Sequence, residues 1–177
     1  MTFIQHYDSP LGDMLLAADE IGVTGLWFES AKYYADTLPR ATEERETPIL
    51  TEAKRWLDCY FSGSEPSFTP SLHPGGSVFR QTVWELLLQI PYGQTTTYGE
   101  LAELAARRLK LSKMSAQAVG GAVGHNAISI IIPCHRVVGA DGSLTGYAGG
   151  LERKLWLLRM EHADINRLFV PGKGTAL

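Results

Sequence analysis

Cys134 and His135 are neighbours in the apolar segment Ile-Ile-Pro-Cys-His-Arg-Val-Val of residues 131–138. A free thiol is only slightly ionised at neutral pH, so a nucleophilic cysteine needs a base or a cation nearby. His135 is a candidate base. Residues 128–132 predict a strand, however, and neighbouring side chains of a strand point to opposite faces. Contact would then need a turn or a bridging water, and a buried cysteine beside a surface histidine is the alternative.

Three other segments offer groups that could serve a reaction or a ligand. Glu161 stands at the end of a predicted helix, where a negative charge opposes the helix dipole; a histidine partner would explain it, and a solvated surface carboxylate is the alternative. Residues 146–150 contain three glycines, which let a main chain approach a ligand closely or simply form a flexible loop. The small residues of 116–122 suit a helix that lies close in a groove, and equally a tightly packed helix.

The first part of the chain predicts a small β-sheet followed by a helix. Apolar segments between Gly- and Asp-containing turns indicate strands at residues 3–7, 14–18 and 23–28. Residues 48–61 carry an apolar stripe at helical spacing. The Ser-, Pro- and Gly-rich residues that follow are typical of a linker, so we expect an N-terminal domain of residues 1–76 that includes it.

The remaining chain, residues 77–177, predicts mostly helices. Ser77 can cap one helix, and Thr97 with Glu100 forms the capping-box pattern at the start of the next. The expected helices span residues 77–89, 97–109, 116–124 and 151–160. The fold class is therefore α+β: a small N-terminal β-sheet domain with a helix, followed by a mainly helical C-terminal domain with a winged-helix-like helix-turn-helix.

Composition and charge are those of a globular protein with an uneven charge distribution. The net charge is −3, yet residues 1–60 hold five Lys/Arg against eleven Asp/Glu and residues 61–177 hold eleven against eight. This asymmetry permits phosphate binding by the second part. No signal-peptide pattern is present, and no apolar run approaches the roughly 18 residues of a spanning helix. We expect a cytoplasmic protein with no membrane partner.

The chain has two cysteines, fewer than a secreted chain of this size would usually carry, which favours a reduced compartment. Cys59 lies on the predicted helix of residues 48–61 and is interpreted as inert core. Cys59, His6 and His73 are dispersed and lack the spacing of a metal-ligand set. We therefore expect no metal and no cofactor.

Residues 132–137, Ile-Pro-Cys-His-Arg-Val, resemble the signature around the acceptor cysteine of the O6-alkylguanine-DNA alkyltransferases. The resemblance covers most of the chain and is loose only in the N-terminal strands. It implies a ribonuclease-H-like domain at residues 1–76 and a DNA-binding, alkyl-accepting domain at 77–177. Further blocks follow the family's order and nearly its spacing, at residues 79–84, 90–93, 97–102, 118–122, 126, 146–150 and 154–161.

The resemblance implies a role for each matched catalytic residue. Cys134 would accept the alkyl group, His135 would take its proton through a water, and Glu161 would hold the imidazole in the required tautomer. Asn126 would fix this network at the joint between the recognition helix and the predicted strand. Tyr98 would donate a proton or hydrogen bond to guanine N3 as the base leaves.

The resemblance also implies how DNA is held. The target atom is buried in a duplex, so the base must be extruded, and the helix of residues 116–122 would enter the minor groove. The loop of residues 146–150 would close over the flipped guanine. The implied substrate-binding residues are Tyr147, Ala148, Gly149, Val137 and Ser129. The implied DNA-binding residues are Gln117, Ala116, Gly120, Gly121, Arg136, Lys113 and Thr97.

The sequence departs from the family pattern at two places. Gln117 stands where the family usually has an arginine that fills the hole left by the flipped base, so flipping is expected to be weaker or assisted by Lys113. The link of residues 107–114 is about five residues longer than is common and carries four basic residues. A solvated basic loop is one interpretation, and extra phosphate contacts are the other.

The favoured activity is alkyl transfer to Cys134. We expect a single turnover per molecule, because no second cysteine stands nearby in the sequence to regenerate the thiol. The expected partner is double-stranded DNA that contains O6-alkylguanine, with O4-alkylthymine as a second candidate substrate and the protein acting as a monomer. A non-catalytic sensor of alkylated DNA is the alternative. Cys134 argues against a sensor and only Gln117 favours it. A thiol protease or redox protein would need no helix-turn-helix.

Overall fold

The computed structural model describes residues 1–172, which form two compact units. Unit 1 consists of Met1–Gly75 together with Ala127–Ile131, and unit 2 consists of Gly76–Asn126 together with residues 132–172. Residues 173–177, the end of the tail for which the sequence suggests no role, lie outside the described residues. None of the helices in the described part is both long and apolar enough to cross a membrane.

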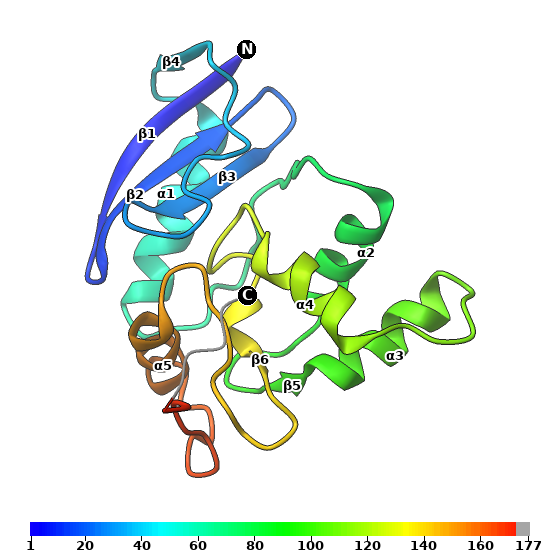
Figure 1. The fold of residues 1–177 in the computed structure, drawn as a ribbon. Coiled ribbons are helices and arrows are strands. Elements are labelled where there is room, and N and C mark those ends of the chain that lie inside the picture. The colour runs from blue at the N-terminus through cyan, green and yellow to red at the C-terminus, as the bar shows by residue number, and fades with distance from the viewer. Residues whose placement is uncertain (173–177) are drawn as a thin grey trace. The chain divides into compact units, whose positions relative to one another are not determined.

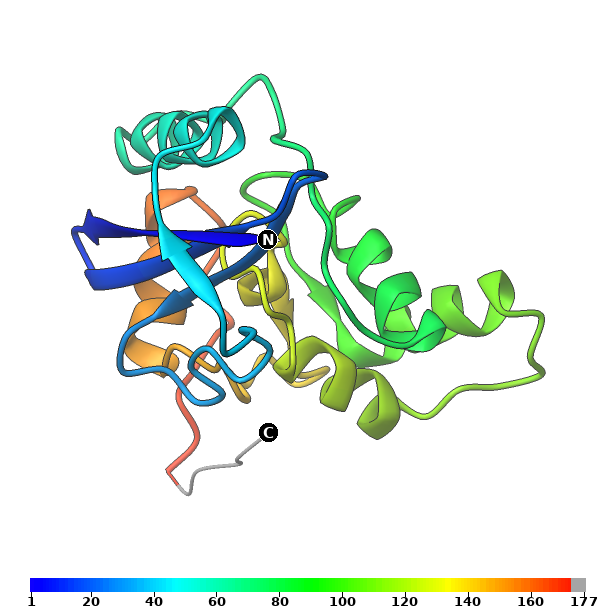
Figure 2. The same ribbon diagram turned by 90° about the horizontal axis from the view of Figure 1, so that it is seen from above.

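Unit 1 is a four-stranded sheet with one helix against it (Figure 1). The strands lie in the order β3-β2-β1-β4; β1–β2 and β2–β3 are antiparallel and β1–β4 is parallel. Helix α1 follows the N-cap Thr47, whose hydroxyl accepts a hydrogen bond from the Leu50 N–H at 3.3 Å. It lies against one face of the sheet in both ribbon views (Figure 2). The bounds are β1 Thr2–Ser9, β2 Gly12–Ala18, β3 Val23–Phe28, β4 Thr42–Glu44 and α1 Pro48–Phe61.

Strand β2 explains why a distant segment belongs to unit 1. Its last five residues are all buried, so both of its faces are covered. Leu15 and Ala17 pack with Trp27 and Ala127, while α1 contacts the sheet from the other face. The Leu26 N–H donates to the Ala127 carbonyl at 2.8 Å, which ties the segment to β3 through the main chain.

Unit 2 is mainly helical, with one short parallel pair of strands, β5–β6. Helices α2, α3 and α4 pack on one another, and the buried Trp84 indole N–H donates to the Ala122 carbonyl at 2.9 Å. The bounds are α2 Val78–Leu87, β5 Thr96–Thr97, α3 Tyr98–Arg108, α4 Ala116–Gly124, the 3-10 turn η1 Cys134–Arg136, β6 Val137–Val138 and α5 Leu151–Met160.

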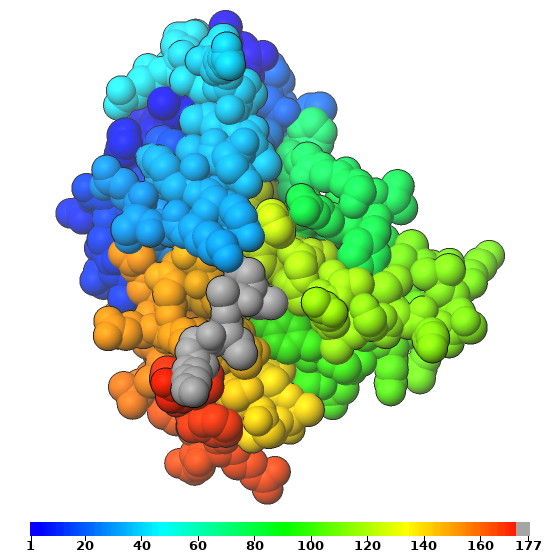
Figure 3. All heavy atoms as spheres, in the orientation of Figure 1, coloured from blue at the N-terminus to red at the C-terminus, as the bar shows by residue number. Residues whose placement is uncertain are grey.

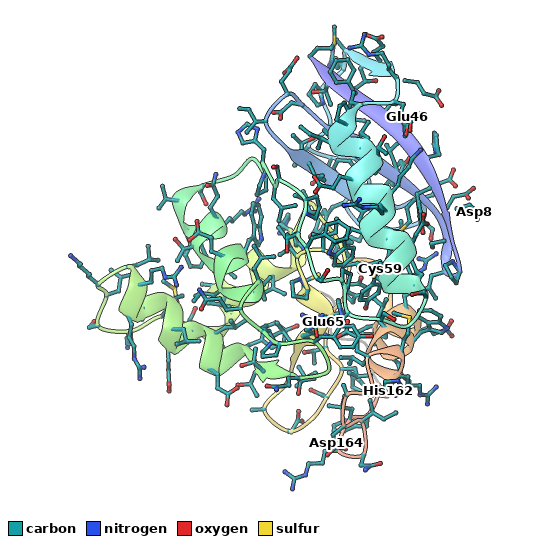
Figure 4. All side chains as sticks on the ribbon, turned by 180° about the vertical axis from the view of Figure 1, so that it is seen from behind. Asp8, Glu46, Cys59, Glu65, His162 and Asp164 are labelled. Atoms are coloured by element: carbon teal, nitrogen blue, oxygen red, sulfur yellow. The ribbon has the colours of Figure 1, made fainter. Side chains whose placement is uncertain are left out.

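Most of the predicted elements are confirmed. The first three strands and all five helices form within two residues of the expected bounds, and the capping box at Thr97 and Glu100 is present with both of its hydrogen bonds. Strands β4, β5 and β6 are too short to leave a pattern in the sequence. Cys59 lies on α1 as expected but is half-buried and outside the helix's buried stripe, so its interpretation as core holds only in part (Figure 4).

The strand predicted at residues 128–132 is wrong. Ile128 makes an isolated bridge to Leu26, after which the chain curls through turns. Ile130 adopts a positive φ of 69°, and the Ile131 N–H donates to the Ser129 carbonyl at 2.8 Å. The whole segment is buried, so its apolar composition reflects burial and not extended pairing.

Candidate active site

Cys134 opens the turn η1 in unit 2 and is buried. Its N–H donates to the Ile132 carbonyl at 2.8 Å, and its own carbonyl accepts from the Val137 N–H. The chain therefore bends at the cysteine instead of continuing in an extended strand. Successive side chains of a 3-10 turn do not alternate between two faces, so the geometry expected to separate Cys134 from His135 does not apply.

His135 forms a buried pair with Glu161, which lies just after α5. Nε2 of His135 is 2.5 Å from Oε2 of Glu161, and both side chains are fully inaccessible. The backbone N–H of Gly93 also donates to Oε1 of the same carboxylate at 3.2 Å. A carboxylate at a helix C-terminus thus has partners that offset the unfavourable dipole, as its position predicts.

Arg136 completes this cluster. Its Nε donates to Oε1 of Glu161 at 2.8 Å, and its Nη1 donates to the Ile90 carbonyl at 2.7 Å. The side chain is only 10% exposed. The contact of Arg136 with DNA stays a prediction; the guanidinium is buried and already donates to a carboxylate and a carbonyl.

The charges of the cluster follow from these contacts. Burial alone would raise the pKa of Glu161, but the hydrogen bonds and charges of His135 and Arg136 outweigh it and hold that pKa well below its usual range. Burial lowers the pKa of His135 despite the favourable Glu161 contact. Glu161 is thus ionised and the imidazole neutral, so Nε2 carries the proton that the carboxylate accepts. Nδ1 of His135 is left as the acceptor and has no protein partner within residues 1–172.

The Cys134 thiol is influenced by two other groups. Burial raises its pKa, whereas a hydrogen bond from the Asn126 side chain and the positive charge of Lys154 lower it. Asn126 also donates from Nδ2 to the Ile132 carbonyl at 2.8 Å, which fixes the amide against the turn that leads into Cys134. Asn126 is thus brought to the cysteine, as expected.

Lys154 is a site residue to which the sequence reasoning assigned no role. It is completely buried on α5, and its Nζ donates to the Thr145 and Gly146 carbonyls, each at 3.2 Å. Burial lowers its pKa from 10.5 to about 8, against the opposing influence of Cys134. One signal could have found it: Lys154 occupies the same helix stripe as the buried Leu157, Leu158 and Glu161, where a solvated lysine is not expected.

Tyr98, the first residue of α3, donates a hydrogen bond to the same carbonyl as Lys154. Its hydroxyl donates to the Thr145 carbonyl at 2.8 Å, and burial raises its pKa to about 12. Both side chains therefore hold the start of the glycine-rich loop of residues 146–150. Gly146 and Gly150 have positive φ values of 58° and 92°, so glycine at the two ends lets the loop turn in and out of this position.

The expected substrate-binding residues fall into two groups. Tyr147 and Ala148 are half-buried and Gly149 is buried in the loop, while Val137 lies in β6 directly after the cysteine turn. Ser129 belongs to unit 1, where it is buried and its N–H donates to the Leu26 carbonyl at 3.0 Å.

Four of the expected DNA-binding residues are exposed in unit 2. Ala116 and Gln117 are exposed in the first turn of α4, Gly121 is exposed with open space beside it, and Lys113 is exposed on the link. Gly120 is instead buried, together with Val119 and Ala122. Thr97 is half-buried, and its hydroxyl caps α3.

The arrangement thus holds a buried thiol, a neutral imidazole oriented by a carboxylate, and a phenol hydroxyl beside a glycine-rich loop. These are the parts of a nucleophile–base–orienter system. Within the described residues, no three His, Cys, Asp or Glu side chains are grouped so that they could hold a metal ion.

Comparison with known proteins identifies the family. The model of the 6-O-methylguanine DNA methyltransferase ribonuclease-like domain matches residues 3–74, and that of the DNA-binding domain matches residues 78–163. The chain belongs to this family. A methylated-DNA–protein-cysteine methyltransferase of Haemophilus influenzae is 40% identical over 161 residues, covering 90% of this chain and 86% of the relative. One of Mycobacterium leprae is 42% identical over 165 residues, covering 93% and 95%.

Solved structures of the family share the fold. Mycobacterium tuberculosis OGT in complex with DNA superposes with a TM-score of 0.78 at 39% identity, covering 90% of this chain and 92% of that one. The O6-methylguanine methyltransferase of the same organism gives a TM-score of 0.76 at 37% identity, covering 98% and 97%. The predicted α+β fold class and the resemblance that the motifs indicated are confirmed.

Proposed function

We propose that this protein repairs duplex DNA by direct reversal, moving a methyl or larger alkyl group from O6 of guanine to Sγ of Cys134. The observation that carries the proposal is the buried Cys134 beside His135, whose imidazole is held by the ionised Glu161. The relatives named methylated-DNA–protein-cysteine methyltransferases support the same reaction class.

The reaction begins with loss of the thiol proton. That proton passes through a bridging water to Nδ1 of His135, and Glu161 stabilises the imidazolium that forms. Sγ then attacks the alkyl carbon, an S–C bond forms, and the C–O6 bond breaks with its electron pair going to the guanine. The guanine anion takes up a proton from water and the imidazolium of His135 releases the one that it accepted, so the thiol hydrogen and the alkyl group exchange places overall.

Tyr98 and the loop act on the guanine itself. Because the pKa of Tyr98 is raised to about 12, its hydroxyl stays protonated at neutral pH and can donate to guanine N3 as negative charge develops there. In the proposal, Tyr147 walls the base and the main chain at Ala148 and Gly149 bonds to O6. Val137 and Ser129 are proposed as further contacts to the base.

DNA binding is assigned to the exposed part of α4 and its surroundings. Ala116, Gln117 and Gly121 are proposed to meet the minor groove, with Thr97 and Lys113 on the phosphates. The base is extruded into the site during the reaction. Residues 77–177 would then act as the DNA-binding, alkyl-accepting domain and residues 1–76 as the N-terminal domain. We propose that the protein acts as a monomer in the cytoplasm.

The reaction is expected to stop after one turnover. Its product is a thioether, which a second thiol does not reverse by disulfide exchange. Substrates are O6-alkylguanine in duplex DNA and, as a second candidate, O4-alkylthymine. The neutral Gln117 is the feature that favours the alternative, a sensor that binds alkylated DNA without reacting.

Intact-mass measurement and a peptide map test the proposal. The protein is incubated with a duplex that contains one O6-methylguanine, and a Cys134→Ser variant is treated in parallel. We expect one added methyl on Cys134, saturating at one per protein and missing from the variant. Tight binding to the damaged duplex without any mass change would support the sensor and reject the transfer reaction.

A further inference from the structure

The segment that joins α3 to α4 has a defined conformation with a lysine in an unusual place. The Lys110 N–H donates to the Arg107 carbonyl at 3.2 Å and the Leu111 N–H donates to the Ala106 carbonyl at 2.8 Å, the hydrogen-bond pattern of a Schellman helix end. Lys110 occupies the left-handed position of that motif with a φ of 57°. Glycine is the residue favoured there, because a side chain is strained in this conformation. The fold alone therefore does not explain the lysine.

Three cations at the end of α3 and in the segment after it are exposed and have no acidic partner among the described residues. Arg107, Lys110 and Lys113 are exposed, and none of them forms a salt bridge to another described residue. The sequence contains no Asp or Glu between Glu103 and Asp141. Arg108 differs, because its Nη1 pairs with Glu85 at 3.2 Å. The positive charge of the segment is thus left uncompensated at three side chains.

The position of the segment links it to the DNA-facing part of unit 2. It leads directly into Ser115, the N-cap of α4, and into the exposed Ala116 and Gln117. In the space-filling view the residues between α3 and α4 protrude from the rest of unit 2 (Figure 3). A protruding row of cations beside the proposed groove-binding helix can reach a duplex backbone without competing for the groove itself.

We propose that Arg107, Lys110 and Lys113 form a phosphate-binding element that grips duplex DNA next to α4. The inference rests on the proposed function, whose partner is duplex DNA. Contacts to phosphates carry no sequence information, so the element raises the affinity for damaged and undamaged duplexes alike. It supplies positive charge in the link that precedes Gln117, the residue that stands where the family pattern has an arginine.

The salt dependence of binding to an undamaged duplex tests this element. Fluorescence anisotropy of a labelled duplex is recorded over a series of salt concentrations for the wild type and for the triple variant Arg107→Gln, Lys110→Gly, Lys113→Gln. The slope of log K against log salt is negative, and each lost phosphate contact reduces its magnitude by about 0.9. The salt slope, taken here as this magnitude, should therefore be roughly 2.7 smaller in the triple variant. Lys54→Gln on α1 removes one positive charge from unit 1 and should leave the slope within about 0.3 of the wild type.

Lys110→Gly alone separates DNA binding from folding. Glycine suits the left-handed position, so the melting temperature should be unchanged or higher while the slope falls by about 0.9. The variant Glu85→Gln releases Arg108 and should raise the slope by up to about the same amount. An unchanged slope in the triple variant would overturn the proposal and point to an acidic protein surface as the partner of these cations.

The outcome is distinguishable from a failure of the proposed function. Methyl transfer by the wild type is measured on the damaged duplex by intact mass in parallel. Transfer together with an unchanged salt slope in the triple variant would retain the repair function and reject the phosphate-binding element. A reduced slope in the triple variant without any methyl transfer by the wild type would retain the phosphate-binding element and reject the repair function.

Discussion

Two groups of cations in unit 2 differ in burial and in partners. Arg136 and Lys154 are buried beside Cys134, and their nitrogen atoms donate to a carboxylate or to carbonyl oxygens. Arg107, Lys110 and Lys113 are exposed at the α3–α4 link without acidic partners among the described residues. Charges in the first group are strong and unscreened, so they set the ionisation of their neighbours. Those in the second group are screened by salt and available to an external partner.

The largest expected effect comes from removing the carboxylate that joins the buried group. Glu161→Gln leaves Arg136 and His135 buried without their counter-charge, which should cost about 3–5 kcal/mol of stability. The rate of single-turnover methyl transfer should fall roughly 10²–10⁴-fold, since the imidazole loses its orienting partner. Chemical denaturation and quenched-flow transfer assays measure the two effects.

Glu152→Gln is the matched control, because Glu152 is an exposed carboxylate on the same helix. It should change neither property. The pKa of Glu161 lies below its usual value in the folded protein, so its contribution to stability is complete above that usual value and is lost as the pH falls toward the folded pKa. A wild type and a Glu161→Gln variant of equal stability at pH 7 would contradict the structural importance of the cluster.

Tyr98→Phe should have the next largest effect on transfer. Loss of the hydroxyl removes the hydrogen bond to the Thr145 carbonyl and the proposed donor to guanine N3. We expect a rate about 10²-fold lower and a loss of about 1 kcal/mol in stability. A comparison of transfer rates at saturating DNA checks this. Equal rates would show that the hydroxyl only holds the loop.

Lys154→Met tests whether a buried cation tunes the thiol. Without the positive charge, the pKa of Cys134 should rise, so the pH–rate profile should shift upward and transfer at pH 7 should slow about tenfold. Titration of the thiol by ultraviolet absorbance, compared with Cys134→Ser, measures the shift directly. Arg159→Gln, which removes an exposed positive charge from the same helix, should leave the profile in place.

The same variant gives a stability change with a defined sign. The pKa of Lys154 is lowered by burial from 10.5 to about 8, so the unfolded chain binds more protons between these values. Wild-type stability relative to Lys154→Met should therefore rise from pH 8 toward 10.5, by about 3 kcal/mol in all. Urea denaturation gives the unfolding free energy of both proteins at each pH. A difference between them that stays constant from pH 8 to 10.5 would show that Lys154 is not held in a low-dielectric site.

Gln117→Arg should have the smallest effect and acts on the exposed group. An arginine adds charge and reach at the start of α4, so affinity for the O6-methylguanine duplex should increase about three- to tenfold with unchanged stability. Gln89→Arg, at an exposed position two residues after α2, adds the same charge elsewhere in unit 2. Equal gains from the two variants would mean that only net charge matters.

Sequence patterns predicted the helices of unit 2 because their determinants are local. Ser77, Thr97 and Ser115 each cap the helix that follows, and a cap requires only residues a few positions apart. The strand at residues 128–132 failed for the opposite reason. Its apolar residues are buried partly against β3 of unit 1, and burial leaves the same composition in a curled segment as in a strand.

The sequence by itself determined the chemistry available to the protein: a thiol beside an imidazole, a phenol, a glycine-rich loop, and a basic link before a helix of small residues. Only the tertiary structure decided which charges face one another. Arg136 and Glu161 lie 25 positions apart, and their contact depends on η1 and the end of α5 meeting in space. Lys154 likewise acquires its lowered pKa from burial, which no local pattern specifies. The reason is physical, because local hydrogen bonds form elements whereas packing sets the dielectric and the partners of each ionisable group.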